Sequence, residues 1–221
     1  FGGSIAMKLY YNPLSTYSQK AIIAFNEKGI AYEPALVDLA SPEGRAAYQA
    51  INPIGKVPFL AAADDWVVPE STTIIEFLED RFPDTPRLIP TDREAARQVR
   101  FMDRAADLYF NDPVVELLFQ HIGFRPNNAE AAERARRYVD VTYSYWDKRL
   151  ASQPWLCGEN FTMADCAAIP PLFYAQVAAP FAQYPNVAAY FARAQQRPSY
   201  AKVKAEFEPA WQAMAAKAKA A

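Results

Sequence analysis

Several residue types that define common classes of protein are scarce in this sequence of 221 residues. It has two cysteines, Cys157 and Cys166, with neither a CxxC spacing nor a histidine nearby. Neither a disulfide scaffold nor a zinc site is therefore predicted. The single histidine, His121, and the lack of a G-x-S-x-G segment argue against a serine hydrolase. A sequence with only two cysteines is typical of a protein from a reducing compartment, and the predicted location is the cytoplasm.

Charge of one sign and long hydrophobic runs are also missing. The formal net charge is -2 and no basic stripe stands out, so nucleic acid is not a predicted partner. The most apolar stretch, residues 166–182, contains three prolines and a glutamine, and we reject it as a membrane span. Residues 1–6 have neither the basic start nor the apolar core of a signal peptide, and we interpret them as a cloning remnant.

The first part of the chain alternates short strands and helices. Strands are predicted at residues 8–11, 32–39, 57–61 and 66–68, and helices from Leu14 to Lys28, at 42–50 and from Ser71 to Phe82. Gly29 is expected to end the first helix. A strand–helix–strand start implies parallel pairing, and the turn at Asp64 and Asp65 implies an antiparallel hairpin. The predicted fold is a small mixed sheet in the order βαβαββα, with helices on its faces.

A stiff connector follows, because residues 83–92 contain three prolines and two aspartates. We therefore predict one domain at 7–82, a linker at 83–92 and a second, all-helical domain at 93–221. Its predicted helices cover residues 93–121 with an interruption at Pro113, 129–152, a segment opened by a capping box between Thr162 and Asp165, 185–196, and the tail from 201. On the second of these helices the predicted apolar side consists of Tyr138, Val141, Tyr145 and Leu150.

The segment from Asn52 to Leu60 is the most informative stretch. Asn52 to Gly55 is predicted to form a turn. Pro58 lies just inside the next strand, where a residue without an N–H is tolerated only at an edge or a strand start. The amide and carbonyl of Val57 are then free to pair with another group. A cis bond between Val57 and Pro58 would expose them most sharply.

The helix that begins near Ser71 has an unusual start. With Ser71 as the predicted N-cap, the N3 position is Ile74, so no capping box forms. The amides of the first turn are left for water or for a carboxylate of a ligand, which the positive end of a helix favours. An ordinary serine-capped surface helix is the alternative interpretation.

Four segments resemble, in order and spacing, the signature segments of the cytosolic glutathione S-transferases. They are Tyr11–Lys20, Asn52–Pro58, Glu70–Ser71 and Phe161–Asp165. The similarity covers nearly the whole chain from Met7 and is to serine-type members, related to the theta, phi and zeta classes and to bacterial relatives. It implies a thioredoxin-like N-terminal domain, an all-α C-terminal domain, a homodimer, glutathione as co-substrate and no metal.

The resemblance assigns catalysis to Ser15, whose hydroxyl would hydrogen-bond the sulfur of glutathione. Ser15 is also a candidate N-cap, and Thr16 or Ser18 could take either role. The absence of cysteine from residues 14–18 argues against glutaredoxin-like and omega-like members, which use a nucleophilic cysteine. A hydroxyl donor at a helix N-terminus can lower a thiol pKa by about one or two units.

The other implied roles concern binding. Val57, ahead of Pro58, would pair its backbone with the cysteinyl part of glutathione, and Lys56 would contact the glycyl end. Glu70 and Ser71 would hold the γ-glutamyl amine and carboxylate.

An electrophile pocket is also implied. It would be formed by Leu14 together with one side of the first long helix of the C-terminal domain. The residues on that side are Met102, Ala106, Tyr109, Phe110 and Pro113. Such a stripe is more often simply helix core.

The predicted function is a glutathione transferase that directs the thiolate at a small hydrophobic electrophile, as in detoxification. The alternatives are a glutathione-dependent isomerase, dehalogenase or peroxidase of the same fold, and a member that binds ligands without turnover. The sequence does not identify the second substrate.

Overall fold

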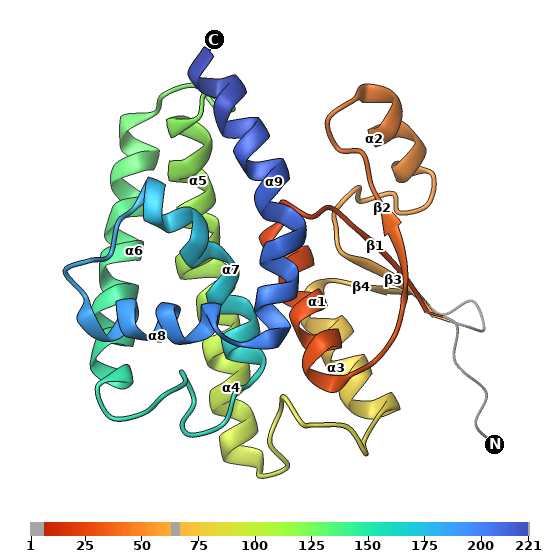
Figure 1. Ribbon diagram of the computed structural model, residues 1–221, viewed down its shortest axis with the longest axis vertical. Coiled ribbons are helices and arrows are strands. Elements are labelled where there is room, and N and C mark those ends of the chain that lie inside the picture. The colour runs from red at the N-terminus through yellow and green to blue at the C-terminus, as the bar shows by residue number, and fades with distance from the viewer. Residues whose placement is uncertain (1–6, 63–66, 221) are drawn as a thin grey trace. The chain divides into compact units, whose positions relative to one another are not determined.

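A computed structural model describes residues 7–62 and 67–220 and divides the chain into two compact units, Phe1–Arg87 and Leu88–Ala221 (Figure 1). The first unit contains β1 (Lys8–Tyr11), α1 (Thr16–Lys28), β2 (Glu33–Leu36), α2 (Pro42–Gln49), β3 (Phe59–Ala61), β4 (Val67–Pro69) and α3 (Ser71–Arg81). The second contains α4 (Arg93–Ala105), the π-helix η1 (Ala106–Asn111), α5 (Asp112–His121), α6 (Ala129–Leu150), α7 (Met163–Ala178), α8 (Pro185–Gln195) and α9 (Pro198–Ala220). The boundary falls within the connector at 83–92. The predicted turn at Asp64 and Asp65, Trp66, and residues 1–6 lie outside the described residues.

The sheet of the first unit has the strand order β2-β1-β3-β4. β1 pairs with β2 in parallel, whereas β3 is antiparallel to both β1 and β4. This confirms the parallel start and the antiparallel hairpin predicted from the element order. The strand predicted at residues 32–39 is shorter in the structure, and β3 begins only after Pro58, because proline has no N–H to donate to the ladder.

Helices α1 and α3 pack against each other beside this sheet (Figure 1). Leu9 and Leu60 from the strands, Ile23 from α1 and Ile74 from α3 are all fully buried. Gly29 ends α1 with a left-handed φ of 65°, as predicted.

A buried ion pair joins the far ends of the same two helices. Lys28 Nζ on α1 lies 2.7 Å from Glu79 Oε1 on α3, and both residues are at most 4% exposed. Lys28 also donates to the carbonyl of Pro86 at 3.1 Å, and Arg87 lies 3.3 Å from the second oxygen of Glu79. These contacts fasten the last residues of the first unit to its helical layer.

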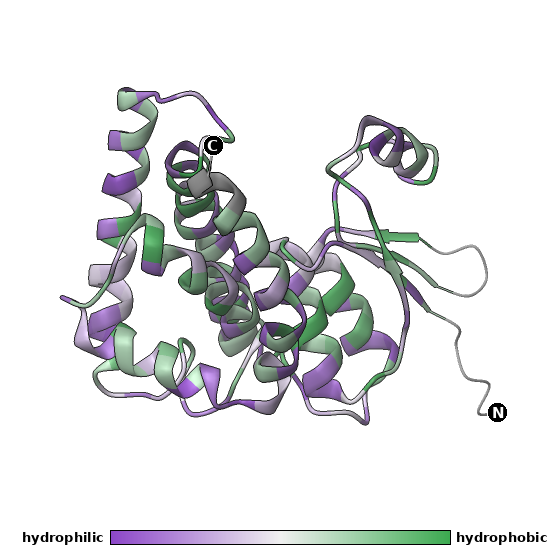
Figure 2. Cartoon of the chain, turned by 45° about the horizontal axis from the view of Figure 1, so that its top comes forward, coloured by the Kyte–Doolittle hydropathy of each residue, from purple (hydrophilic) through white to green (hydrophobic). Residues whose placement is uncertain are grey.

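In the second unit α7 packs against α4, η1, α5 and α8 (Figure 1). Its buried side chains include Met163, Cys166 and Leu172, so α7 is the centre of the helical core. Figure 2 shows a different pattern on α6, the helix at the left of that view, where hydrophilic and hydrophobic residues alternate as expected for a helix with one buried face.

The buried face of α6 is not the one predicted. Tyr138, Val141 and Tyr145 are 46%, 65% and 40% exposed. Only Leu150 of the predicted side is buried, and the residues buried with it are Ala132, Ala135, Val139, Thr142, Tyr143 and Trp146. The prediction was wrong because large apolar residues occur on both faces of this helix. The side with Trp146 packs inward, where its ring lies 4.7 Å from that of Phe110.

The predicted helix over residues 93–121 is interrupted before Pro113 rather than at it. It becomes a π-helix at 106–111, and Pro113 lies in the first turn of α5. In an unbroken α-helix the carbonyl of Tyr109 would accept from residue 113, which as proline has no N–H. Thr142 Oγ1 of α6 donates to that carbonyl at 3.1 Å instead. A neighbouring helix thus satisfies the acceptor that proline leaves open.

The predicted capping box at the start of α7 is confirmed. Asp165 is fully buried, and its Oδ2 accepts from the Thr162 amide at 2.9 Å. Its Oδ1 accepts from the Leu156 amide at 3.0 Å and from Tyr190 Oη of α8 at 2.9 Å. Burial raises the pKa of Asp165 to about 6, so the carboxyl group is still ionised at neutral pH. One carboxylate therefore joins α7, α8 and the preceding loop.

We expect Asp165→Ala to lower the free energy of unfolding by about 3 kcal/mol or more, because it leaves several buried donors unpaired. Urea denaturation measures this loss. Glu159→Ala removes an exposed carboxylate nearby and is expected to change stability by less than about 0.5 kcal/mol. Wild-type stability of Asp165→Ala would contradict the structural role of this residue.

Candidate functional site

The ends of three strands lie together at one edge of the first unit's sheet. Because β3 is antiparallel to β1, Phe59 at the start of β3 pairs with Tyr10 near the end of β1. Because β4 is antiparallel to β3, Pro69 at the end of β4 pairs with the same Phe59. The loop after β1, the segment before β3 and the segment after β4 therefore emerge side by side. The predicted residues that they carry are Ser15, Lys56, Val57, Pro58, Glu70 and Ser71.

The loop after β1 is fixed by Asn12. Its Oδ1 accepts from the Leu14 amide at 3.0 Å, and its Nδ2 donates to the carbonyl of Val37 after β2 at 3.2 Å. Its carbonyl accepts from the Ser15 amide at 3.0 Å. One asparagine thus determines where α1 begins relative to the sheet.

Ser15 is the N-cap of α1. Its backbone is extended, and its Oγ accepts from the Ser18 amide at 3.2 Å. This contact uses the hydroxyl oxygen as an acceptor and leaves the O–H free to donate. The capping role and the catalytic role considered for Ser15 are therefore compatible.

The two alternative hydroxyls lie deeper. Ser18 has no exposed surface, and its Oγ accepts from the Asn12 amide at 3.3 Å. Thr16 is 6% exposed. Ser15 is half-buried, so it is the most accessible of the three hydroxyls.

Two buried side chains hold the carbonyl of Lys56. Tyr48 Oη donates to it at 2.7 Å and Asn52 Nδ2 at 2.9 Å. Asn52 also accepts from the Ile54 amide at 3.3 Å, and Gly55 has a φ of 70°, which confirms the predicted turn. Because the fixed carbonyl belongs to the peptide group that Lys56 shares with Val57, this turn determines how Val57 is presented.

The bond between Val57 and Pro58 is cis, as predicted. Pro58 is buried, whereas Val57 is half-buried and Lys56 is exposed. Within residues 7–62 and 67–220, no group hydrogen-bonds to the amide or carbonyl of Val57. Both groups are therefore available to an extended peptide, as in strand addition.

The start of α3 differs from the prediction by one residue. Its N-cap is Glu70, and Ser71 is the first helical residue. Glu70 has a φ of 69°, a left-handed value that costs a residue with a side chain about 1–3 kcal/mol. This conformation of Glu70 redirects the chain at the end of β4, so the helix can begin at Ser71.

The first turn of α3 has no side-chain cap and no acidic residue. The Glu70 carboxylate is exposed, and Ser71 is 3% exposed. The missing capping box was predicted correctly, although for the wrong N-cap. The positive end of this helix thus lies beside an exposed carboxylate, which suits a ligand that carries both an ammonium and a carboxylate group.

The residues predicted for an electrophile pocket belong to different units. Leu14 lies in the first unit and is half-buried. In the second unit Met102, Ala106, Phe110 and Pro113 are buried, whereas Tyr109 is 46% exposed. Phe110 packs against Tyr143 and Trp146 of the helical core. The pocket stays a prediction.

The histidine and the two cysteines lie in the second unit, whereas the predicted site residues at the strand ends lie in the first. His121 ends α5 and is exposed. Cys166 is fully buried, and burial raises the pKa of Cys157 to about 12. A thiol with so high a pKa is a poor nucleophile at neutral pH.

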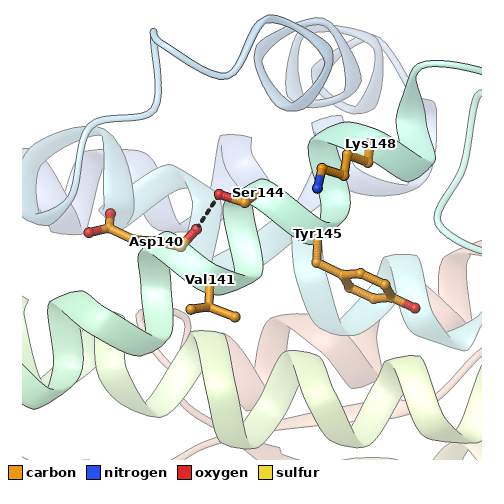
Figure 3. Close-up of a pocket in the computed structure, with 5 residues that line it drawn as sticks. All are labelled: Asp140, Val141, Ser144, Tyr145 and Lys148. Carbon is orange, nitrogen blue, oxygen red and sulfur yellow. Dashed lines mark hydrogen bonds between the residues drawn. The ribbon is translucent and has the colours of Figure 1, made fainter.

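A hollow of about 380 Å³ lies on the surface of the second unit (Figure 3). Its lining residues, Asp140, Val141, Ser144, Tyr145 and Lys148, all come from α6 and include none of the predicted site residues. None of the described helices is long and apolar enough to cross a membrane. The described residues also contain no cluster of three or more side chains that could hold a metal ion.

Comparisons with known families agree with the two-unit division. Residues 9–86 match the family described as glutathione S-transferase, N-terminal domain, and residues 129–193 match glutathione S-transferase, C-terminal domain. Glutathione S-transferase 3 of Zea mays is 29% identical over 90% of this chain and 93% of its own. A maleylpyruvate isomerase of a Ralstonia species is 30% identical over 74% of this chain and 80% of its own.

Solved structures show the same similarity. A glutathione S-transferase of Methylobacillus flagellatus, crystallised with glutathione bound, is 31% identical and has a TM-score of 0.79 over 90% of this chain and 98% of its own. A glutathione transferase of Populus trichocarpa has a TM-score of 0.81 at 21% identity, over 92% of this chain and 99% of its own. The latter likeness concerns the fold alone.

We expect Tyr48→Phe and Asn52→Ala each to change glutathione affinity by less than about three-fold, because one donor still holds the Lys56 carbonyl. The double variant should lose about ten-fold, since that carbonyl is then unfixed. Isothermal titration calorimetry measures both. Tyr143→Phe, which removes a hydroxyl donor to the Ala179 carbonyl in the other unit, is the control and should leave affinity unchanged. A double variant with wild-type affinity would show that this turn does not position Val57.

Proposed function

The chain belongs to the glutathione S-transferase family, and we propose that it binds glutathione across the three strand ends and ionises its thiol for attack on a small hydrophobic electrophile. No metal takes part in this scheme. We further propose that it works in a reducing compartment, the cytoplasm, because Cys157 and Cys166 are both free thiols.

The observation that carries this proposal is the meeting of three segments at one sheet edge. Neighbouring strands lie about 4.8 Å apart, so the loop after β1 and the start of α3 are separated by roughly 10 Å. An extended tripeptide spans about 10 Å as well. Glutathione therefore has the length to place its sulfur near Ser15 and its γ-glutamyl end near Glu70 while its cysteinyl backbone passes Val57.

The groups near α3 and in the segment before β3 have the chemistry that the corresponding parts of glutathione require. Glu70 can accept from the γ-glutamyl ammonium, and the uncapped first turn of α3 can receive the γ-glutamyl carboxylate. The Val57 amide and carbonyl can pair with the cysteinyl backbone. Lys56 is exposed and is proposed to contact the glycyl carboxylate.

Ser15 is proposed to act on the sulfur. The thiol loses its proton to solvent, and the Ser15 O–H donates to the thiolate that remains. A donor at the N-terminus of α1 stabilises the anion more than the neutral thiol, so the thiol pKa falls. The thiolate then forms a bond to an electrophilic carbon. Either a leaving group departs from that carbon with its bonding electrons, or the π electrons of a double bond move to the neighbouring atom, which takes up a proton.

We expect Ser15→Ala to cut turnover about ten-fold or more and to raise the pKa of the bound thiol by about one unit, while glutathione affinity changes less than about three-fold. The measurements are conjugation kinetics with chlorodinitrobenzene and thiolate absorbance near 240 nm against pH. Glu70→Gln should show the reverse, with weak binding and a near-normal thiol pKa at saturation.

The control for lost capping is Ser41→Ala, because Ser41 Oγ caps α2 in the same unit by accepting from the Gly44 amide. It should lower stability like Ser15→Ala without changing the thiol pKa. If Ser15→Ala keeps both its rate and its thiol pKa, the catalytic hydroxyl is not Ser15, and Thr16 and Ser18 become the residues to test.

An isomerase is the second candidate, favoured by the 30% identity to a maleylpyruvate isomerase. An isomerase returns glutathione, whereas a transferase consumes it. Counting free thiols while the substrate is converted separates the two. One thiol lost per product supports the transferase, and constant thiol supports the isomerase.

We also propose a homodimer, which the family resemblance implies and which would cover an exposed surface of the second unit. This apolar face consists of Phe101 of α4, Leu108 and Tyr109 of η1, and Tyr138, Val141 and Tyr145 of α6, each 40–65% exposed. The rings of Tyr109 and Tyr138 stack at 5.7 Å and join the two halves of this face. Exposed apolar side chains that lie together, as these two rings do, are typical of an interface.

Charges beside this face suit a second copy of the same chain. Asp140 and Lys148 lie four residues before and after Ser144 on α6, and all three line the hollow of Figure 3. If two copies of α6 cross antiparallel about Ser144, Asp140 of each copy meets Lys148 of the other. A twofold interface requires such self-complementarity.

We expect Val141→Asp to convert the dimer into a monomer, because it places a charge in the buried interface. Light scattering should then give 24.8 kDa instead of about twice that mass. Val177→Asp introduces the same charge at a 46% exposed valine of α7 and should stay dimeric. Asp140→Lys should weaken association, and adding Lys148→Asp should restore it. A dimeric Val141→Asp would exclude this face as the interface.

A further inference from the structure

Lys20 on α1 is a buried cation close to the proposed glutathione site. It is 1% exposed, although lysine is among the residue types least often fully buried. Burying an ammonium group costs free energy unless the surroundings compensate for the lost water. A lysine in this position therefore calls for an explanation beyond packing.

One contact of Lys20 lies at the start of α3. Its Nζ donates to Thr72 Oγ1 at 2.8 Å. Thr72 is the second residue of α3 and directly follows Ser71. Helices α1 and α3 lie side by side (Figure 1). The ammonium group thus reaches the helix turn whose amides we propose as the receptor of the γ-glutamyl carboxylate.

Two sources of positive charge favour an anion at the first turn of α3. The N-terminus of a helix carries partial positive charge, and the first turn of α3 has neither an acidic residue nor a side-chain cap to balance it. Lys20 adds a full positive charge beside that turn, from the side of the protein interior. Charge in a poorly hydrated environment acts more strongly than on the surface.

We propose that Lys20 is a positioning residue of the glutathione site, which orients the first turn of α3 through Thr72 and strengthens its attraction for the γ-glutamyl carboxylate. This inference rests on the proposed function. It assigns Lys20 to the binding of glutathione and not to the ionisation of its thiol, which is the role of Ser15.

Lys28 offers a matched comparison on the same helix. It is 3% exposed and also reaches α3, but its Nζ binds Glu79 Oε1 at 2.7 Å, two turns beyond Thr72 along the helix. Replacing Lys28 removes a buried cation and a link between α1 and α3 without changing the first turn of α3. It therefore reports what loss of a buried lysine does to the fold alone.

The experiment measures glutathione KM, kcat, the pKa of the bound thiol and thermal stability for the full chain. For Lys20→Met we expect KM to rise about ten-fold or more, while kcat and the thiol pKa at saturating glutathione stay near the wild-type values. Lys20→Arg keeps the charge and should recover most of the affinity. Thr72→Val keeps Lys20 and removes one acceptor of its Nζ, so a smaller rise in KM is expected. This variant provides the test if Lys20→Met does not fold.

Lys28→Met should lose stability and keep its glutathione KM. If Lys20→Met and Thr72→Val lose stability but keep their KM, Lys20 is structural and the inference is overturned. A fall in kcat or a raised thiol pKa at unchanged KM also overturns it, because the effect would then lie at the sulfur. A wild-type protein that binds no glutathione would contradict the proposed function itself, which separates that failure from a failure of the role of Lys20.

Discussion

The site depends on the antiparallel pairing of β3 with both of its neighbours. Phe59 pairs with Tyr10 on one side and with Pro69 on the other, so the end of β1, the start of β3 and the end of β4 share one edge of the sheet. A parallel β3 would place its start at the opposite edge and separate Val57 from Ser15 and Glu70. The backbone groups proposed to bind glutathione, which are the Val57 amide and carbonyl and the first-turn amides of α3, are therefore positioned by strand pairing.

The chemistry of neighbouring residues made most of the first unit's fold and the start of α7 predictable from the sequence. Proline at residue 58 cannot donate to a ladder, which indicated both the strand start and the unpaired Val57 backbone. Gly29 and the pair Thr162 and Asp165 each satisfy helix ends within a few residues, so their roles follow from spacing alone. The two-unit organisation followed from the prolines of residues 83–92 and the change in pattern beyond them.

The sequence-based predictions were wrong where contacts between distant residues determine the local structure. Serine is usually the better N-cap, yet Glu70 takes that position because the chain must turn sharply after β4. On α6 both faces carry large apolar residues, and only the helices packed around Trp146 determine which face is buried. Near Pro113 the outcome depends on Thr142, which lies 33 residues from the carbonyl that it satisfies. Lys20 gave no signal in the sequence, because a lysine in a helix is ordinarily exposed.

We propose that one glutathione molecule spans all three strand ends. A crystal structure of the protein with glutathione tests it most directly. We expect paired hydrogen bonds between the cysteinyl residue and the Val57 backbone, the γ-glutamyl carboxylate at the first turn of α3, and the sulfur within hydrogen-bonding distance of Ser15 Oγ. Glutathione bound elsewhere, or bound here with its γ-glutamyl end away from α3, would contradict the account.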